Sequence, residues 1–526
     1  MERMIWRLLS VDSPFSRQAL LVFFTFSLFH LFTFVCCPLS LAQTVQSSET
    51  LTELYKKDNC TVYTFNYPSI NAAGEATVLS SAIFAWTPEK RRETDSIESL
   101  HIYCHFTITS DAERPSTPGF SKEQVLLSLF PNREYKSLFG ESANYVGRCI
   151  VIAPDYEGYG VTKDMPHPYL SQRLTARQVT DAVPYGLALY QKESQESSTL
   201  LHMKSNWRSF SMGYSQGGAV SLATHRYIEE AGLADELHFQ GSLCGDGPYD
   251  LVQTIRYYFE KGVTTMPVVM PLIVKGMFYS HPDVARYKLE DFLSQQLLDT
   301  GVLDWIDSKE YSSDEIALMW YQQLQQGLDS LGHNYTPEQM AELFESPKKD
   351  KVWAYIRNMF TPEVCEYLSD PNNFDAVPEE ITSAPKAIHR ALADNSLITG
   401  WEPQHRIQFF HTKDDTVVPY DGNYLSFRDA HSYGEGDLFR VNDTFNKSDH
   451  VDAGIDFLVE LFTLKSYSKY FNWICEGPTT VIDLIDNPQF SIDNDAWYTL
   501  DGRRLIAKPS VKGVYIYKGR KTVVSR

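Results

Sequence analysis

The sequence predicts an α/β fold in which a mostly parallel sheet carries helices on both faces, with an inserted helical cap and a small C-terminal β-module. Three observations favour this architecture. Buried strand patterns alternate with helical patterns up to residue 247, which is typical of parallel sheets. The pattern is then helical, without clear strands, over residues 248–401. Strand patterns resume at residue 402, and short strands separated by turns follow residue 476.

These changes of pattern divide the 526 residues into five parts. The predicted parts are a signal peptide at 1–42, the first part of the core at 43–247, the cap at 248–401, the second part of the core at 402–470 and the β-module at 476–526.

Composition limits the classes of partner. Hydrophobic residues make up 43% of the chain, enough for a sizeable core, and the formal net charge is −20. Nucleic acids and anionic membrane surfaces attract basic patches, so this charge argues against both as partners. We therefore expect no nucleic-acid partner.

The N-terminus has the pattern of a signal peptide. Arginines at positions 3, 7 and 17 precede an apolar run over residues 19–35, and Ser40 and Ala42 supply small residues before a cleavage site at Gln43. We expect an exported protein that is periplasmic, cell-surface or secreted. The alternative is an uncleaved N-terminal anchor, because the apolar run is nearly long enough to span a bilayer.

The first core elements follow in order. Residues 60–67 and 76–86 alternate well enough to form a hairpin. Residues 100–108 and 148–155 are apolar runs that predict buried strands, and a helix is predicted at about 176–191.

A G-x-S-x-G turn from Gly213 to Gly217 separates a β-prone run from an Ala/Leu-rich helical segment at 219–231. A strand, a sharp turn and a helix form the context of a nucleophile elbow, which raises the serine hydroxyl above the sheet. Ser215 is therefore the candidate nucleophile. The peptide N–H of Gln216, at the helix N-terminus, is a candidate donor to an oxyanion.

After a strand at 237–245, the predicted cap contains amphipathic stretches at 313–331 and 337–344 and a markedly apolar stretch at 266–279. The apolar stretch suits the core of the cap. It would equally suit a hydrophobic wall over a serine site, which favours an acyl chain or an apolar ester.

Two further strands, at 405–411 and 438–442, each lead into a loop with polar residues. The first loop contains Asp414 and Asp415, and the second contains His450. We favour Asp415 as the acid, since Asp415 to Pro419 matches a D-x-x-V-P pattern that follows the acid in many α/β-hydrolases; Asp414 remains the alternative. His431 competes with His450 but precedes the last strand.

The three residue types fit nucleophilic catalysis. A serine hydroxyl needs a base to take its proton as it attacks. A histidine accepts that proton and returns it to the leaving group, while a carboxylate fixes the imidazole tautomer.

The chain contains the motifs G-Y-S-Q-G-G at 213–218, D-Y-E-G-Y-G at 155–160, H-P-Y-L at 167–170 and G-P-Y-D-L at 247–251. Together with Asp415 and His450, these motifs resemble the secretory-lipase-like branch of the α/β-hydrolase superfamily, over roughly residues 60–470. The resemblance implies cleavage of carboxylic esters through an acyl-enzyme, by Ser215, Asp415 and His450 and without a cofactor. The resemblance implies that the backbone N–H of Phe106 or Thr107 completes the oxyanion hole. Relatives usually carry His-Gly-Thr where this chain has His105, Phe106 and Thr107, so we expect a narrower or differently shaped pocket.

The C-terminal segment reads as short strands separated by Asp-Gly and Lys-Gly turns. It resembles the small β-module at the end of many exported proteins of Bacteroidota-type bacteria. The alternative is a hairpin that only packs on the catalytic domain.

The sequence contains no C-x-x-C pair, H-E-x-x-H or other compact metal-ligand cluster, so we expect no metal site. Six cysteines follow the predicted signal peptide, and their wide spacing allows either disulfides or buried free thiols.

The leading hypothesis is an exported serine esterase or lipase acting on a small-molecule or lipid ester, with peripheral contact to a lipid interface as an option. A serine peptidase of the prolyl-peptidase type is one alternative, although residues 43–99 are too few for its usual β-propeller. A non-catalytic binding scaffold is the other. The sequence leaves the acyl-chain length, the alcohol and the oligomeric state open.

Overall fold

The computed structural model describes the chain from residue 45 onward, with gaps. The predicted signal peptide lies outside the described residues. These are residues 45–57, 59–88, 95–119, 124, 127, 149–326, 344–348, 351–374, 376–443, 449–462, 464–478, 496–499, 504–505, 507–509, 511, 513–517 and 520–524.

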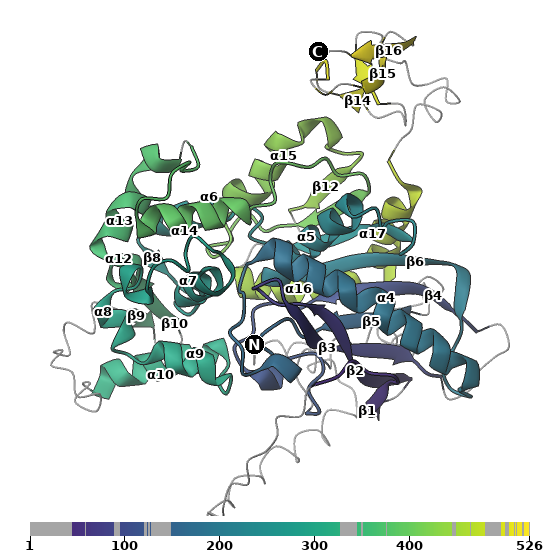
Figure 1. The fold of residues 1–526 in the computed structure, drawn as a ribbon, viewed down its shortest axis with the longest axis horizontal. Helices are drawn as coiled ribbons and strands as arrows, with labels where there is room; N and C mark the ends of the chain where they lie inside the picture. Colours follow the sequence, from purple (N-terminus) through teal and green to yellow (C-terminus); the bar gives the residue numbers. More distant parts are fainter. Residues whose placement is uncertain are drawn as a thin grey trace, which may run out of the picture. The chain divides into compact units, whose positions relative to one another are not determined.

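A nine-stranded sheet forms the core, in the order β1-β2-β3-β5-β4-β6-β7-β11-β12 (Figure 1). The first three strands pair antiparallel, and every pair from β5 to β12 is parallel. The predicted α/β class is therefore confirmed, including the hairpin, in which Cys60 pairs with Trp86. The strands are β1 (Thr52–Lys57), β2 (Cys60–Ile70), β3 (Ala76–Trp86), β4 (Ile97–Cys104), β5 (Cys149–Pro154), β6 (Met203–Tyr214), β7 (Phe239–Gly245), β11 (Arg406–Phe410) and β12 (Phe439–Asn442).

Helices cover both faces of this sheet because alternate side chains of each strand point to opposite faces. In β11, the ring of Phe409 packs against Phe427, whereas the ring of the next residue, Phe410, packs against Phe457 and Tyr470. The core helices are α4 (Gln172–Glu196), α5 (Gln216–Glu230), α15 (Ser426–Ala430), α16 (His450–Phe462) and α17 (Leu464–Glu476), with short helical turns η3 (Asp111–Glu113), η5 (Gly160–Thr162), η9 (Asp421–Leu425) and η10 (Ser432–Gly434).

Between β7 and β11 the chain forms a cap whose helices gather beside the sheet, at the left of Figure 1. The apolar stretch at 266–279 contributes α7, whose side chains are largely buried in the cap core. The cap helices are α6 (Leu251–Lys261), α7 (Val269–Ser280), α8 (Gln295–Leu298), α9 (Val302–Ser308), α10 (Ser313–Gln326), α12 (Ile356–Met359), α13 (Pro362–Ser369) and α14 (Ala384–Asp394), with turns η6 (Leu289–Asp291) and η8 (Pro371–Phe374).

The expectation that the cap lacks strands was wrong. A three-stranded antiparallel sheet joins β8 (Val263–Thr264), β10 (Lys351–Tyr355) and β9 (Phe344–Lys348). These strands are two to five residues long, which is too short for a clear period-2 alternation, and β9 contains Pro347, which lowers its strand propensity. Most of the helix predicted at 337–344 lies outside the described residues, but its last residue, Phe344, begins β9.

The C-terminal segment forms a separate four-stranded sheet in the order β14-β13-β15-β16. Its resemblance to the C-terminal β-module of exported proteins of Bacteroidota-type bacteria stays a prediction. The strands are β13 (Trp497–Tyr498), β14 (Arg504–Leu505), β15 (Gly513–Tyr517) and β16 (Arg520–Val524).

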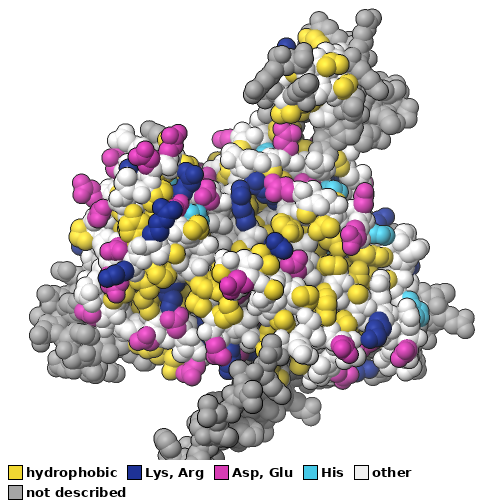
Figure 2. Space-filling view, viewed as in Figure 1, with side chains coloured by type: hydrophobic (Ala, Val, Ile, Leu, Met, Phe, Trp, Pro, Cys, Tyr) yellow, Lys and Arg dark blue, Asp and Glu magenta, His cyan; other side chains and the backbone are white. Residues whose placement is uncertain are grey.

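The surface agrees with the acidic composition. On the face shown in Figure 2, Lys and Arg side chains lie singly or in small groups among acidic ones, with apolar side chains between them. Among the described residues, no helix combines the length and the apolar character needed to cross a bilayer. None of the six described cysteines, which follow the predicted signal peptide, forms a disulfide bond, and four of them are buried.

Candidate active site

Ser215 stands between β6 and α5 in a strained backbone conformation. Its φ is 58° and its ψ is −124°, a region that non-glycine residues rarely adopt. Its N–H donates to the carbonyl of Gly245 on the neighbouring strand, at 2.9 Å. The strain is held by the surrounding strands, so the serine is fixed at the carboxyl edge of the sheet.

The glycines of the motif are required by close backbone approach. A Cβ on Gly217 would lie 2.0 Å from the carbonyl oxygen of Cys104, and one on Gly213 would lie 2.4 Å from the carbonyl oxygen of Gly217. No side chain fits at either position, which explains the pattern G-x-S-x-G in physical terms.

The structure brings His450 into hydrogen-bond contact with Ser215 and Asp415. Its Nε2 lies 2.8 Å from Ser215 Oγ, and its Nδ1 lies 2.6 Å from Asp415 Oδ2. In this arrangement Nδ1–H donates to the carboxylate, which leaves Nε2 to accept the serine proton. The hydroxyl of Tyr214 donates to the carbonyl of His450 at 2.6 Å and holds the start of α16 against the elbow.

The two adjacent aspartates have different environments. Asp415 is buried, and its Oδ1 accepts the N–H groups of Val417 and Val418 at 2.7 and 2.8 Å, which leaves Oδ2 for the imidazole. Asp414 is exposed. Asp415 is therefore the carboxylate that holds His450.

The competing histidine, His431, has a structural place. Its Nε2 donates to the carbonyl of Ile398 at 2.8 Å, and its ring packs against Phe427 and Trp401. It bridges α15 and the segment before β11.

A narrow cavity of about 20 Å³ lies over Ser215. Gln216 and Thr107 share its wall with the serine, so two of the three predicted oxyanion residues are gathered there. Thr107, rather than Phe106, lines the cavity, and the Phe106 carbonyl instead accepts from the ring of His105 at 2.7 Å. The departure from His-Gly-Thr therefore leaves the third residue of the motif at the site.

Two side chains that the sequence did not predict, Tyr169 and His167, contact the proposed oxyanion residues Thr107 and Gln216. Tyr169 Oη lies 2.8 Å from Thr107 Oγ1 and also lines the cavity. Burial raises the pKa of Tyr169 to about 12, so the phenol keeps its proton. The H-P-Y-L pattern was the available signal, but nothing in the chain order connects it to Thr107.

His167 orients the side chain of Gln216. Its Nδ1–H donates to the carbonyl of Glu157 at 2.7 Å, and its Nε2 accepts from Gln216 Nε2 at 3.0 Å. Burial, with a smaller contribution from Lys309, lowers the pKa of His167 well below its usual value. The ring is therefore neutral and can accept this hydrogen bond.

Asp246, at the carboxyl end of β7, is a second buried carboxyl group beside Asp415 that the sequence reasoning did not single out. Its Oδ1 accepts the N–H of Thr412 at 2.8 Å. Burial, and then the charge of Asp415, raise the pKa of Asp246 well above its usual value. Burial and the neighbouring charge therefore favour the protonated form of Asp246. Its position directly after a predicted strand was the only available signal.

We predict that Asp246→Asn gains stability relative to the native protein as the pH rises above about 4. Asn resembles the protonated carboxyl group in shape and keeps an acceptor for Thr412. Because the folded state of the native protein holds a proton that the unfolded chain releases above its lower pKa, native stability falls with rising pH, by at most about 1.4 kcal/mol per pH unit. Thermal unfolding of both proteins from pH 5 to 9 measures this.

Asp414→Asn supplies the control for loss of an aspartate, because Asp414 is exposed and is not part of the buried Asp246–Asp415 pair. A pH-independent difference between Asp246→Asn and the native protein would contradict the protonated state of Asp246.

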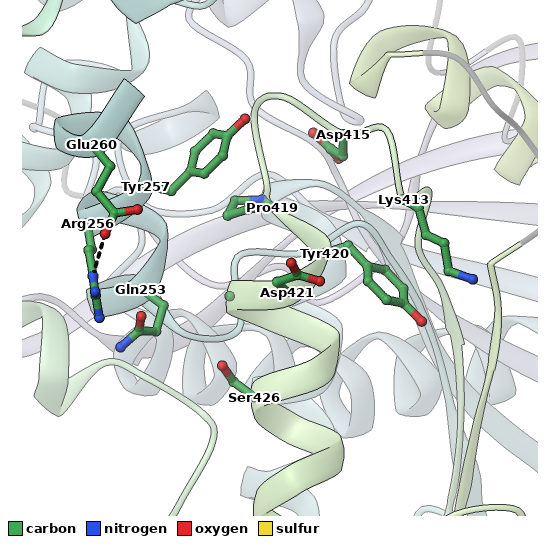
Figure 3. Close-up of a pocket in the computed structure, with 11 residues that line it drawn as sticks. Gln253, Arg256, Tyr257, Glu260, Lys413, Asp415, Pro419, Tyr420, Asp421 and Ser426 are labelled. Atoms are coloured by element: carbon green, nitrogen blue, oxygen red, sulfur yellow. Dashed lines mark hydrogen bonds and ion pairs between the residues drawn. The ribbon is translucent and has the colours of Figure 1, made fainter. Parts of the chain in front are cut away.

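A second and larger cavity, of about 390 Å³, lies beside residues 411–420, the loop that carries Asp415 and is called the acid loop below (Figure 3). Asp415 and Pro419 line it together with Tyr257 of α6 and Lys413. Thr254 and Tyr258, neighbours of its α6 residues, line the serine cavity instead. The loop and α6 therefore form a wall between the two cavities.

Two groups of described side chains have metal-ligand geometry, with ligand atoms within 4.8 Å of one another. One group consists of Asp246, His411 and Asp415, and it includes the carboxylate that holds His450. In the other, Glu229 Oε1 lies 3.0 Å from His225 Nε2 and 2.8 Å from His405 Nδ1, and it also accepts the N–H of His405. These hydrogen bonds tie α5 to the start of β11. The sequence did not predict this group, because His405 lies far along the chain from His225 and Glu229 of α5.

Comparison with known proteins identifies similarity only at the level of structure. No family model and no curated protein matches the sequence. The chain is similar to a rice cell wall degrading esterase, LipA, from Xanthomonas oryzae, with a TM-score of 0.50 and 18% identity over 80% of this chain and 90% of that one. It is also similar to a protein of Legionella pneumophila assigned as a hydrolase, with a TM-score of 0.51 and 18% identity over 80% and 91%. Together with the mostly parallel sheet and its helices, these similarities show that the chain has the α/β-hydrolase fold.

Proposed function

We propose that this protein is a serine hydrolase that cleaves carboxylic esters, an esterase or lipase of the secretory-lipase-like branch. One observation carries the proposal: the hydrogen bonds that link Ser215, His450 and Asp415 at the strained turn after β6. A serine in this conformation, with a histidine and a carboxylate in line behind it, is the arrangement that activates a hydroxyl for acyl transfer.

The reaction follows from this geometry. Ser215 Oγ attacks the ester carbonyl carbon while His450 Nε2 takes the hydroxyl proton, and Asp415 stabilises the imidazolium. The backbone N–H of Gln216 stabilises the tetrahedral oxyanion, together with the backbone at Thr107 in the same cavity wall. The C–O bond then breaks, and the alcohol leaves with the proton from His450. Water attacks the acyl-enzyme with His450 again as base, which releases the acid and restores Ser215. No cofactor takes part in these steps.

The two solved structures give further support, since one protein is named an esterase and the other a hydrolase. We extend only the cleavage of esters to this protein, and we do not propose cell-wall material as its substrate. The prolyl-peptidase alternative is disfavoured because the described residues before β4 include β1, β2 and β3, which belong to the same sheet as the strand before Ser215.

Export remains part of the proposal. It rests on the arginines and the apolar run at 19–35 in the N-terminal sequence. An exported esterase would meet small-molecule or lipid esters outside the cytoplasm.

Hydrolysis of p-nitrophenyl acetate by the purified protein tests the proposed function. We expect saturable release of p-nitrophenol, and no cleavage of a prolyl p-nitroanilide peptide by the same preparation. Cleavage of the peptide alone would favour the peptidase alternative, and turnover of neither substrate would favour a binding scaffold.

A further inference from the structure

We propose that the enzyme is selective for short acyl groups, acetyl and propionyl, because the cavity over Ser215 has room for no more. The inference rests on the proposed ester hydrolysis and names the acyl class that the site accepts.

The acyl group, rather than the alcohol, occupies this cavity. Gln216, whose N–H is the proposed oxyanion donor, and Thr107 lie in the cavity wall beside Ser215. A carbonyl oxygen directed at them from a carbon bonded to Ser215 Oγ places the rest of the acyl group against the remaining walls. Those walls are apolar and match an alkyl group: Leu170, Met266, Val269, Ile273, Val417 and Val418.

The volume sets the length. The second cavity has a volume of about 390 Å³, so the space of about 20 Å³ over Ser215 is roughly a twentieth of it. A space this small suits an acyl group with only one or two carbons beyond the carbonyl. Acetyl has one such carbon and propionyl has two, whereas octanoyl has seven and would have to displace the walls.

The walls are held from several sides, which opposes such displacement. Tyr258 of α6 donates from its hydroxyl to the carbonyl of Val417 at 2.6 Å, which ties α6 to the acid loop. Asn423 Nδ2 donates to the Pro419 carbonyl at 3.0 Å, and its Oδ1 accepts the N–H of Asp250 at 3.0 Å. The loop between β11 and α15 is therefore fixed to the start of the cap.

Helix α7 is held against the core on the opposite wall. A Cβ on Gly276 would lie 2.3 Å from the carbonyl oxygen of Tyr169, so the helix touches the backbone of the H-P-Y-L loop directly. At the end of α7, Tyr279 donates to Glu157 Oε1 at 2.6 Å. Val269 and Ile273 are one turn apart on this helix and are buried, so their positions are set by contacts on both sides.

A chain-length series tests the inference with the full protein. We expect kcat/KM for p-nitrophenyl octanoate to be about 100-fold or more below that for the acetate, because overpacking a filled cavity is penalised for each inserted methylene. In Ile273→Ala, which removes three carbons from the wall, the octanoate-to-acetate ratio should rise about tenfold or more. Val269→Ala is a second, smaller enlargement for use if the first variant folds poorly.

Ile388→Ala is the matched control. Ile388 is a buried isoleucine of α14 in the same cap core, away from the cavity wall, so its truncation is expected to leave the ratio unchanged. A shift in this variant equal to that in Ile273→Ala would mean general loosening of the cap and would overturn the wall argument.

The outcomes separate the two proposals. Native turnover of octanoate equal to that of acetate, or a jump in long-chain turnover when a lipid interface is added, would overturn the short-acyl inference and leave ester hydrolysis standing. Absence of turnover for every ester in the series would instead overturn the proposed function, and the inference with it.

Discussion

Replacing Ser215 with alanine is expected to lower kcat for p-nitrophenyl acetate by about 10⁴-fold or more, with the fold retained. The substitution removes the only atom that can form the acyl-enzyme, and the remaining oxyanion donors supply the residual rate. The strained backbone at φ 58° is equally unfavourable for serine and alanine, and alanine adds no atoms that clash. Steady-state kinetics with both proteins measure the effect.

A second serine of the same strand provides the control. Ser205 is exposed on β6, and Ser205→Ala should keep native kinetics and a native melting temperature. If Ser215→Ala kept more than about a tenth of native kcat, the acyl-enzyme route through Ser215 would be excluded, because removing the nucleophile of a triad lowers kcat by several orders of magnitude.

Replacing Asp415 with asparagine is expected to lower kcat by about 10⁴-fold, whereas the same change at Asp414 is expected to leave it within about twofold. The introduced asparagine would still accept the N–H groups of Val417 and Val418 through its amide oxygen. It would then present an amide N–H to His450 Nδ1, which favours the tautomer with a proton on Nε2. That tautomer cannot accept the proton of Ser215.

The comparison uses neighbouring residues with the same side chain, so a difference between them reports geometry rather than charge. Both variants should unfold at similar temperatures when their kinetics are compared. A large loss in Asp414→Asn with native rates in Asp415→Asn would mean that the acid loop has another arrangement during turnover.

The sequence was informative about the core because its signals are local. Ser215, Asp415 and His450 each follow an apolar strand pattern, and the carboxyl ends of parallel strands meet at one edge of a sheet. Chain order and strand pattern were therefore enough to predict which loops meet, whereas the preference for Asp415 over Asp414 came from the D-x-x-V-P pattern at Asp415 to Pro419.

The remaining features depend on contacts between distant segments. Thr107 and Tyr169 share a cavity wall with Val269 and Val417, and no periodicity connects these positions. The burial of Asp246 beside Asp415 depends on the pairing of β7 with β11, and the short cap strands depend on pairing partners rather than on their own residues. The sequence analysis predicted a narrower pocket because Phe106 stands where relatives have glycine. Phe106 does not line the cavity, whereas residues of the cap and of the acid loop do.

Covalent labelling by a fluorophosphonate, mapped by mass spectrometry, tests the central claim most directly. The account predicts a single adduct on Ser215 of the native protein, formed at a normal rate in Asp414→Asn and far more slowly in Asp415→Asn. A native protein that remains unlabelled, or that carries its adduct on a residue other than Ser215, would contradict the account.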